Sequence, residues 1–264
     1  RLVADAAASG SRVVCRMTLG LAQGNLLVPD WPAPARVRSC ITTRAGGISL
    51  APFDRFNLGT HVGDEPQAVA ENRQRLSAVL GCEPAWLQQV HGVAVVEADP
   101  QRVAEADASW TGTPGVASVV LTADCLPVLF CDRNATRVAA AHAGWRGLAA
   151  GVLEATLASL ALPAEQVLVW LGPAIGPQAF EVGAEVREAF LSDHPRAAAE
   201  AFLPSQNSGR YMADIYQLAR IRLAACGVSA VYGGGGCTFT DPRFFSYRRQ
   251  PRTGRFASLI WLVD

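Results

Sequence analysis

The sequence predicts an α+β fold, a single domain in which mixed β-sheets are flanked by helices. Three observations lead to this prediction. Short extended apolar runs alternate with amphipathic ones, half of the 264 residues are hydrophobic while 17% are charged, and no repeat, long linker or change of composition divides the chain. The expected domain spans residues 26–264, and residues 1–25 are expected to be an N-terminal extension with little order of its own.

The first third of the chain is predicted to contain a strand, a helix and a turn that carries a histidine. Residues 35–43 have the composition of a strand that ends at the turn RAGG. Residues 64–81 carry apolar side chains at helical spacing, with Asp64 as the expected N-cap and Gly81 as the terminator. Short extended runs lie on both sides of His91, which is therefore expected in a turn or at a strand end.

Three successive strands are predicted between residues 117 and 143. Pro127 follows the first of them closely, and because proline cannot donate to a sheet we expect an edge strand or a bulge there. The last strand of the chain is largely apolar and is compatible with the core or with the interface of a homodimer. The remaining elements are predicted in the order helix 147–162, strand 166–172, helices 183–193 and 211–227, and strands 229–233 and 257–263.

The residue counts exclude several classes of function. The 23 acidic and 23 basic residues balance, so no overall field favours nucleic acid, and no apolar run approaches the roughly 20 residues of a membrane span. Every basic residue is arginine, which excludes sites that depend on a lysine. Four histidines are too few for a multicopper oxidase, so a multicopper centre is not supported. Seven scattered cysteines without a C-x-x-C pair fit a reducing cytoplasm.

Two histidines and a cysteine form the candidate site. His91, Cys125 and His142 each lie beside small or turn-forming residues, and they are far enough apart in sequence that only the fold can bring them together. Two imidazoles and a thiolate suit Zn²⁺ with one position left open, which is the catalytic arrangement. The same residues could instead be a cysteine nucleophile with its histidine base, or simply buried side chains.

Several ordered motifs resemble the YfiH family, whose members are also called laccase-domain proteins. The similarity runs from about residue 26 to the C-terminus. The motifs that carry it are TTRAGG (42–47), QQVHG (88–92), TADCLPVLF (122–130), AHAGWRG (141–147), GPAIGP (172–177) and FFSYRR (244–249).

The resemblance implies an enzyme with one zinc ion per chain, held by His91, Cys125 and His142. It implies purine nucleoside and phosphate as substrates: family members are described as cleaving adenosine, inosine, guanosine and methylthioadenosine with phosphate and as deaminating adenosine. The older family label, polyphenol oxidase, conflicts with the histidine count. The alternative function, also associated with relatives, is hydrolysis of an amide in a mis-loaded UDP-sugar amino acid, a cell-wall precursor.

Phosphate needs cationic or N–H-rich contacts, and arginine presents a planar fork that suits it. This favours Arg44, which precedes two glycines, and Arg248 and Arg249 in the run RFFSYRRQPRTGR. Arg146 is expected at the start of a helix, where a cation is unfavourable unless it meets an anion or a carboxylate.

The sequence offers several candidates for the residue that carries a proton during the reaction. Asp124 is a candidate to orient His142 or a bound water, or to act as general acid or base, and it could equally accept backbone N–H groups. Glu181 is a candidate to contact a ribose hydroxyl or to move a proton. His61 and Cys237 are further candidates, a loop residue near the site and a second thiol.

Overall fold

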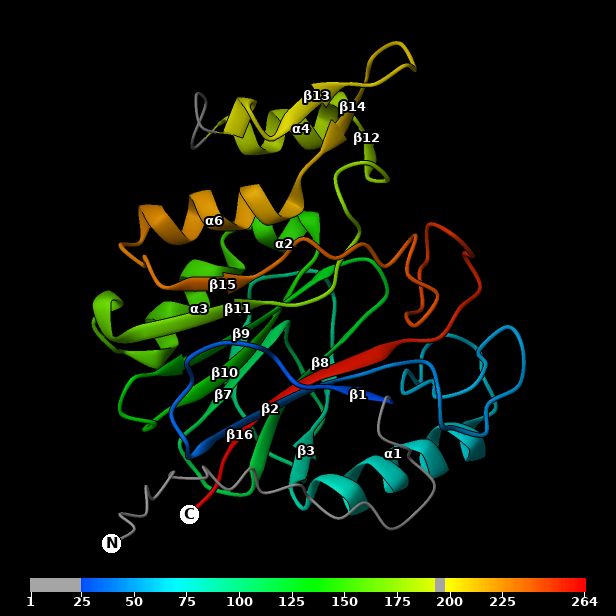
Figure 1. Ribbon diagram of the computed structural model, residues 1–264, viewed down its shortest axis with the longest axis vertical. Helices are drawn as coiled ribbons and strands as arrows, with labels where there is room; N and C mark the ends of the chain where they lie inside the picture. Colours follow the sequence, from blue (N-terminus) through cyan, green and yellow to red (C-terminus); the bar gives the residue numbers. More distant parts are fainter. Residues whose placement is uncertain (1–24, 193–197) are drawn as a thin grey trace, which may run out of the picture.

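Two β-sheets packed against each other form the centre of the protein (Figure 1). The computed structural model describes residues 25–192 and 198–264. The first sheet has the order β1 (Leu26–Leu27), β2 (Val37–Thr42), β16 (Phe256–Leu262), β8 (Val116–Thr122) and β3 (Glu83–Ala85). The second sheet has the order β15 (Val231–Gly233), β11 (Val167–Leu171), β9 (Leu126–Asp132), β10 (Val138–Ala143), β7 (Ala108–Thr111) and β5 (Val95–Glu97).

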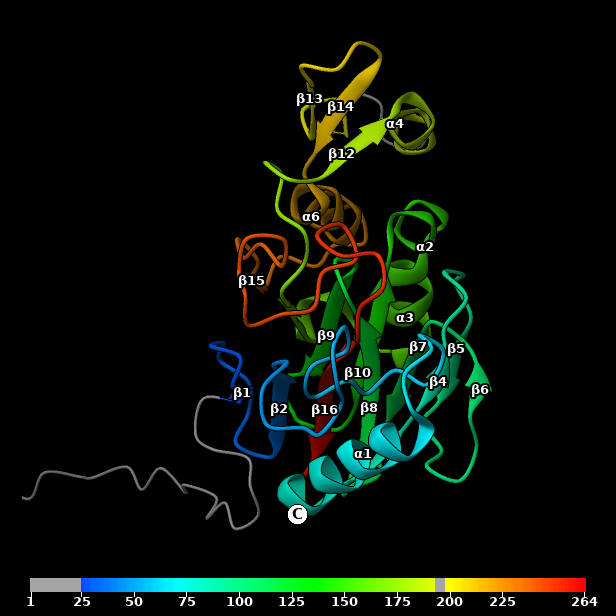
Figure 2. The ribbon, with the colours of Figure 1, turned by 90° about the vertical axis from the view of Figure 1, so that its right-hand side faces the viewer.

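Helices cover the outer faces of both sheets, and Figure 2 shows them on opposite sides of the strands. Helix α1 (Pro66–Leu80) packs on the first sheet. On the second sheet lie α2 (Trp145–Ala150), α3 (Val152–Leu160) and α6 (Ile215–Ala225). A small three-stranded sheet at one end has the order β12 (Glu181–Gly183), β14 (Arg210–Ala213) and β13 (Phe202–Pro204), and it lies beside α4 (Ala184–Leu191). Strand β4 (Leu87–Gln88) pairs with β6 (Ala104–Glu105). A short 3₁₀ helix, η1 (Ala164–Gln166), precedes β11.

Successive side chains of a strand alternate between its two faces, and this alternation explains the layers. In β9, Val128 and Phe130 belong to the cluster under α2, α3 and α6, whereas Leu129 and Cys131 belong to the cluster between the two sheets. Successive strand side chains point to opposite faces, so a strand buried on both faces is apolar throughout. The predicted α+β domain with mixed sheets flanked by helices is therefore confirmed, as are the three strands between residues 117 and 143.

The prediction for Pro127 is wrong, because β9 is an internal strand that pairs with both β10 and β11. Pro127 is the second residue of β9, and its carbonyl accepts a hydrogen bond from the N–H of Gly172 at 2.8 Å. Gly172 lies just beyond the end of β11, so the missing N–H of Pro127 faces the place where the neighbouring strand has finished.

Three helix predictions also need correction. The helix predicted over 147–162 is broken at Gly151, which adopts φ 103° and separates α2 from α3. The helix predicted over 211–227 begins only at Ile215, because Asp214 accepts the N–H groups of Tyr216 and Gln217 and the residues before it form β14. Helix α1 is preceded by Glu65 rather than capped by Asp64, whose carboxylate instead bonds Asn57 at 2.9 Å.

The last strand belongs to the core. Every residue of β16 is buried, and the strand lies between β2 and β8. It therefore supplies no interface, and the homodimer stays a prediction without support from this strand. No helix in the described ranges is long and apolar enough to cross a membrane.

Candidate metal centre

His91, Cys125 and His142 meet at one end of the two sheets. One ligand atom from each of them lies within 4.8 Å of the other two, and the Sγ of Cys125 lies 3.8 Å from Nε2 of His91. The two imidazoles are in edge contact, with ring centroids 4.7 Å apart. His91 is exposed, Cys125 half-buried and His142 buried, so the cluster runs from the surface into the interior.

Strand register explains why Cys125 and His142 are neighbours. His142 in β10 lies directly opposite Pro127 in β9. Cys125 precedes Pro127 by two residues, which puts it diagonally across from His142 on the same side of the sheet. Both side chains therefore point toward the other sheet, at the end where the strands give way to loops.

Asp107 connects the two histidines. Its carboxylate is fully buried and lies 2.8 Å from Nδ1 of His142. It also accepts the backbone N–H groups of Val90, His91 and Gly92, at 3.2, 2.9 and 2.6 Å. These bonds hold the turn in which His91 adopts the left-handed backbone conformation, with φ 62°.

The contact with Asp107 fixes the orientation of the His142 ring. In the neutral ring Nδ1 donates to the carboxylate and Nε2 has a free lone pair, which is how metal-binding imidazoles are usually held. Orienting His142 was one of the roles considered for Asp124, while Asp107 was not among the predicted site residues. No signal marks Asp107 in the sequence, because its partners lie 15 to 35 residues away and the pairing of β7 with β10 brings them together.

The metal-free cluster favours a thiolate beside an imidazolium. Burial by itself would raise the pKa of Cys125, but hydrogen bonds and charge from His142 and His91 lower it to about 6. Burial would likewise lower the pKa of His142, but Asp107 and Cys125 raise it to about 9. Between these values the pair carries opposite charges that stabilise each other.

A pH titration of the metal-free protein tests this charge state. We expect the thiolate absorbance of Cys125 to appear as the pH rises through about 6, far below the ordinary thiol pKa, since His142 keeps its proton to about pH 9. The measurement is the ultraviolet difference spectrum between wild type and Cys125→Ser, which removes the signal of the other cysteines. A midpoint near the ordinary value would contradict the assignment.

Two glycines leave room for the histidines. A Cβ at residue 144 would lie 2.7 Å from Cδ2 of His91 and 3.1 Å from Sγ of Cys125, and one at residue 147 would lie 2.7 Å from the carbonyl oxygen of Gly92. Both distances to the His91 turn are shorter than real Cβ contacts. The start of α2 can therefore pack against the cluster only with glycine at these positions.

Replacing Gly144 by alanine should displace His91 and weaken metal binding by about 10-fold or more while the sheets remain folded. Gly236→Ala is the matched control, because the nearest atom to its added Cβ is 3.8 Å away. Metal competition with a chromogenic chelator measures the affinity, and circular dichroism checks the fold. Equal affinities in the two variants would show that the crowding at Gly144 is harmless.

The donor set fits zinc. Bonds of about 2.0–2.3 Å at tetrahedral angles hold ligand atoms roughly 3.3–3.8 Å apart, so atoms within 4.8 Å of one another need to approach by about 1.5 Å at most. A borderline-soft set of two nitrogens and one thiolate suits Zn²⁺, and three protein ligands leave one position open. In the part of the chain that the structure describes, this is the cluster that could hold a metal ion.

A cavity of about 280 Å³ opens beside the cluster. Of the predicted substrate-contacting residues, Asp124, Arg248 and His61 line it. Arg255 and Tyr247 belong to the arginine-rich run RFFSYRRQPRTGR, whose arginines and aromatic rings are expected to suit phosphate and purine, and they line the cavity too, whereas Gln89 was not anticipated. The complete lining is His61, Gln89, His91, Leu121, Thr122, Ala123, Asp124, Cys125, His142, Ile175, Phe180, Tyr247, Arg248 and Arg255.

Asp124 lies in this lining but has its own partners. It adopts a left-handed conformation with φ 90°, accepts the hydroxyl of Thr238 at Oδ1 and the N–H of Arg248 at Oδ2, both at 2.6 Å. Its carbonyl oxygen accepts the N–H of Ile175 at 2.9 Å. Asp124 thus joins three segments around the cavity, and the contact with His142 belongs to Asp107.

The other predicted residues lie outside the lining and have other partners. Arg44 bonds the carboxylate of Asp54 at 2.8 Å, and Glu181 accepts the side chain of Asn207 at 2.7 Å. Arg146 is exposed and lies over the ring of Trp145. The structure therefore brings together only part of the predicted anion-binding set.

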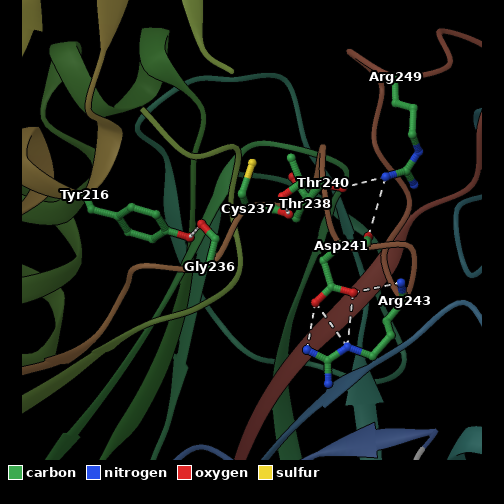
Figure 3. Close-up of polar contacts among 8 residues, drawn as sticks. All are labelled: Tyr216, Gly236, Cys237, Thr238, Thr240, Asp241, Arg243 and Arg249. Carbon is green, nitrogen blue, oxygen red and sulfur yellow. Dashed lines mark hydrogen bonds and ion pairs between the residues drawn. The ribbon is translucent and has the colours of Figure 1, made fainter. Parts of the chain in front are cut away.

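Arg249 holds the segment that borders the cavity. Figure 3 shows its guanidinium reaching across the loop, where NH1 donates to the carbonyl oxygen of Thr238 at 2.8 Å. NH1 also donates to the carbonyl oxygen of Phe239 at 2.9 Å. At the other end of the segment the hydroxyl of Tyr216 donates to the carbonyl oxygen of Gly236 at 3.0 Å. The bonds of Arg249 to the loop carbonyl groups are consistent with its absence from the cavity lining, to which the preceding residue, Arg248, belongs.

Cys237 is the second unusual thiol. Its sulfur accepts the N–H of Gly176 at 3.2 Å, and this bond, with others from Thr240, outweighs burial and lowers the pKa of Cys237. It does not line the cavity of about 280 Å³. Any labelling experiment on Cys125 must therefore identify the modified peptide, because both thiols are activated.

Comparison with known proteins gives concordant matches. The family model described as multi-copper polyphenol oxidoreductase laccase matches residues 38–263. A curated relative from Pseudomonas aeruginosa, a purine nucleoside phosphorylase, is 70% identical over 239 residues and covers 90% of this chain and 98% of its own length. The purine nucleoside phosphorylase YfiH of Escherichia coli is 56% identical over 243 residues, with coverage of 90% and 99%.

Solved structures agree with these matches. A Neisseria meningitidis protein, 52% identical, has a TM-score of 0.88 and covers 91% of this chain and 100% of its own. YlmD from Geobacillus stearothermophilus, 30% identical, has a TM-score of 0.82 with coverage of 87% and 93%.

Proposed function

This chain belongs to the YfiH family, which the polyphenol oxidoreductase laccase family model describes, and from this we propose that it is a zinc-dependent purine nucleoside phosphorylase. The observation that carries the proposal is the cluster of His91, Cys125 and His142, which borders a cavity that two arginines also line. Close relatives named purine nucleoside phosphorylase support the reaction class.

The proposed substrates are phosphate and the nucleosides adenosine, inosine, guanosine and methylthioadenosine. In phosphorolysis an oxygen of phosphate forms a bond to C1′ of the ribose while the bond from C1′ to the purine nitrogen breaks. The electron pair leaves with the purine, which takes up a proton. Zinc, when bound by the three ligands, would act as a Lewis acid that stabilises developing negative charge.

The chain's own residues supply the remaining tasks. Asp107 keeps the His142 ring oriented through a contact of 2.8 Å, and Arg248 and Arg255 present positive charge to the cavity. Adenosine deaminase activity is a second part of the proposal. Zinc deaminases of known mechanism use an H-x-E motif that this sequence lacks, so the proton carrier here must be a different residue.

The copper chemistry suggested by the family description does not suit this sequence. Four histidines cannot furnish a blue-copper site and a histidine-rich cluster.

We also propose a cytoplasmic location and no nucleic-acid partner. The balance of acidic and basic residues and the free cysteines of the described residues support this.

The test is chromatography of adenosine incubated with the purified protein, with and without phosphate. We expect adenine and ribose 1-phosphate to form only with phosphate, and neither product with Cys125→Ala. Inosine appearing without phosphate would report deamination. Consumption of adenosine without phosphate and without inosine would contradict phosphorolysis.

A hydrolase with Cys125 as nucleophile is the second candidate. The lowered pKa of Cys125 and its neighbouring histidines favour it, and its substrate would be the amide of a UDP-sugar amino acid. Under the phosphorylase proposal the purified protein carries one zinc per chain, and iodoacetamide labels the Cys125 peptide only after chelation. Rapid labelling of that peptide with the metal in place would favour the thiol hydrolase.

A further inference from the structure

The cavity beside the cluster has an excess of positive charge. Arg248 and Arg255 line it, and Asp124 is the one carboxylate in that lining. Both oxygens of Asp124 already accept short hydrogen bonds, from the hydroxyl of Thr238 and from the backbone N–H of Arg248. An anionic ligand is therefore the partner that this cavity is best suited to accept.

Sheet pairing brings Arg255 to the cluster. Arg255 immediately precedes β16, and the following residue, Phe256, pairs with Thr122 in β8. Continuing that register by one step puts Arg255 opposite Ala123, two residues before Cys125. Arg255 thus comes from the far end of the chain yet borders the same cavity as His91 and Cys125.

The stem of Arg255 is held firmly. Its backbone N–H donates to the side-chain oxygen of Asn57 at 2.8 Å, and a Cβ on Gly59 would lie only 2.9 Å from its Cγ. The NH1 nitrogen donates to the carbonyl oxygens of Thr253 and Gly254 at 3.1 and 3.0 Å. The guanidinium is therefore positioned before any ligand arrives.

The rest of the guanidinium lacks a partner. Within the residues the structure describes, no carboxylate lies within 4.0 Å of Arg255, and neither Nε nor NH2 has a hydrogen-bond acceptor. The negative charges nearest to this half-buried cation, those of Cys125 and Asp124, form no direct ion pair with it, so binding an anion would stabilise it. Thr122, across from Phe256, also lines the cavity, and its buried hydroxyl has no partner among the described residues.

His61 adds a donor on the same side. It lines the cavity, and burial together with the charges of Arg255 and Arg73 lowers its pKa. A neutral imidazole can donate one hydrogen bond to an oxyanion without adding to the positive charge already present.

We propose that Arg255 and His61 form an oxyanion subsite of this cavity and that inorganic phosphate is the ligand it takes. Arg255 supplies the fork of Nε and NH2, which matches two oxygens of a tetrahedral anion. The assignment of phosphate as a co-substrate rests on the proposed function, whereas the anion site itself rests on the contacts of Arg255. This subsite replaces Arg44 and Arg249 as the predicted phosphate contacts, because the side chains of those two residues already have partners within the protein.

The experiment measures phosphate binding and phosphorolysis separately. Isothermal titration with inorganic phosphate is performed on the zinc-loaded wild type, on Arg255→Gln and on Arg102→Gln, an exposed arginine that does not line this cavity. We expect Arg255→Gln to weaken phosphate binding by about 10–100-fold, the loss of a charged hydrogen-bonded contact, and Arg102→Gln to change nothing. In kinetics the KM for phosphate should rise by the same factor, while the KM for the nucleoside changes by less than about threefold.

Each outcome decides one of the two proposals. Unchanged phosphate affinity in a folded Arg255→Gln protein overturns the subsite. Arg255-dependent phosphate binding without phosphorolysis keeps the subsite and overturns the proposed function. If Arg255→Gln does not fold, Arg255→Lys and His61→Asn replace it: both should still bind phosphate more weakly than wild type, and wild-type affinity in both would overturn the subsite.

Discussion

Replacement of His142 by alanine is expected to abolish metal binding and nucleoside turnover and to lower the free energy of unfolding by about 3–5 kcal/mol. His142 is one of the three candidate ligands and also the hydrogen-bond partner of Asp107, a carboxylate with no exposed surface. Without the imidazole, the negative charge of Asp107 stays buried opposite a cavity. Metal analysis and chemical denaturation of the purified variant measure the two effects.

The matched variant is His91→Asn. It removes a ligand as well, but the backbone N–H of residue 91 can still donate to Asp107, and asparagine tolerates the left-handed conformation of this position. We expect loss of metal with a change in unfolding free energy well below that of His142→Ala. Equal destabilisation of the two variants would show that the pair of His142 and Asp107 does not stabilise the fold.

The second large effect is expected for Asp107→Asn. The amide offers one acceptor oxygen where the carboxylate offers two, so it cannot accept both the His142 ring and the three backbone N–H groups of residues 90–92. Each buried donor left without an acceptor costs about 1–3 kcal/mol. Loss of the contact that orients a ligand typically weakens metal binding or activity by about 10–100-fold.

Asp132→Asn provides the control for this prediction. Asp132 is also fully buried and accepts the backbone N–H groups of Asn134, Thr136 and Arg137, but it contacts no metal-ligand candidate. We expect both variants to be less stable and only Asp107→Asn to bind metal more weakly. If zinc affinity, measured by chelator competition, falls equally in both, the effect of Asp107 is a general loss of structure.

The sequence predicted the residues whose chemistry is rare and missed those whose role depends on geometry. His91, Cys125 and His142 could be named because histidine and cysteine are few and lie beside small residues. Asp107 is one of many carboxylates, and only the pairing of β7 with β10 brings it to His142. Arg248 and Arg249 are adjacent, yet one lines the cavity and the other binds loop carbonyl groups.

Some of the fold errors had a visible signal. Asp214 followed three residues later by Gln217 is a capping pattern that marks the start of α6, and it was hidden within a longer helical run. The break at Gly151 comes from its left-handed conformation, with φ 103°, which a glycine within a helical run can adopt. The place of Pro127 in an internal strand depended on where β11 ends, which no local pattern records.

Asp107 accepts hydrogen bonds from the main chain of His91 and from the ring of His142, so one carboxylate limits how far the two imidazoles can separate before an ion is bound. We expect the number and kind of donors to select the ion: Ca²⁺, which requires six to eight oxygens at about 2.3–2.6 Å, would not find them here, whereas a four-coordinate ion that accepts nitrogen and sulfur would. Asp107 would thereby fix the geometry of two ligands from a position in the sheet, without being a ligand itself.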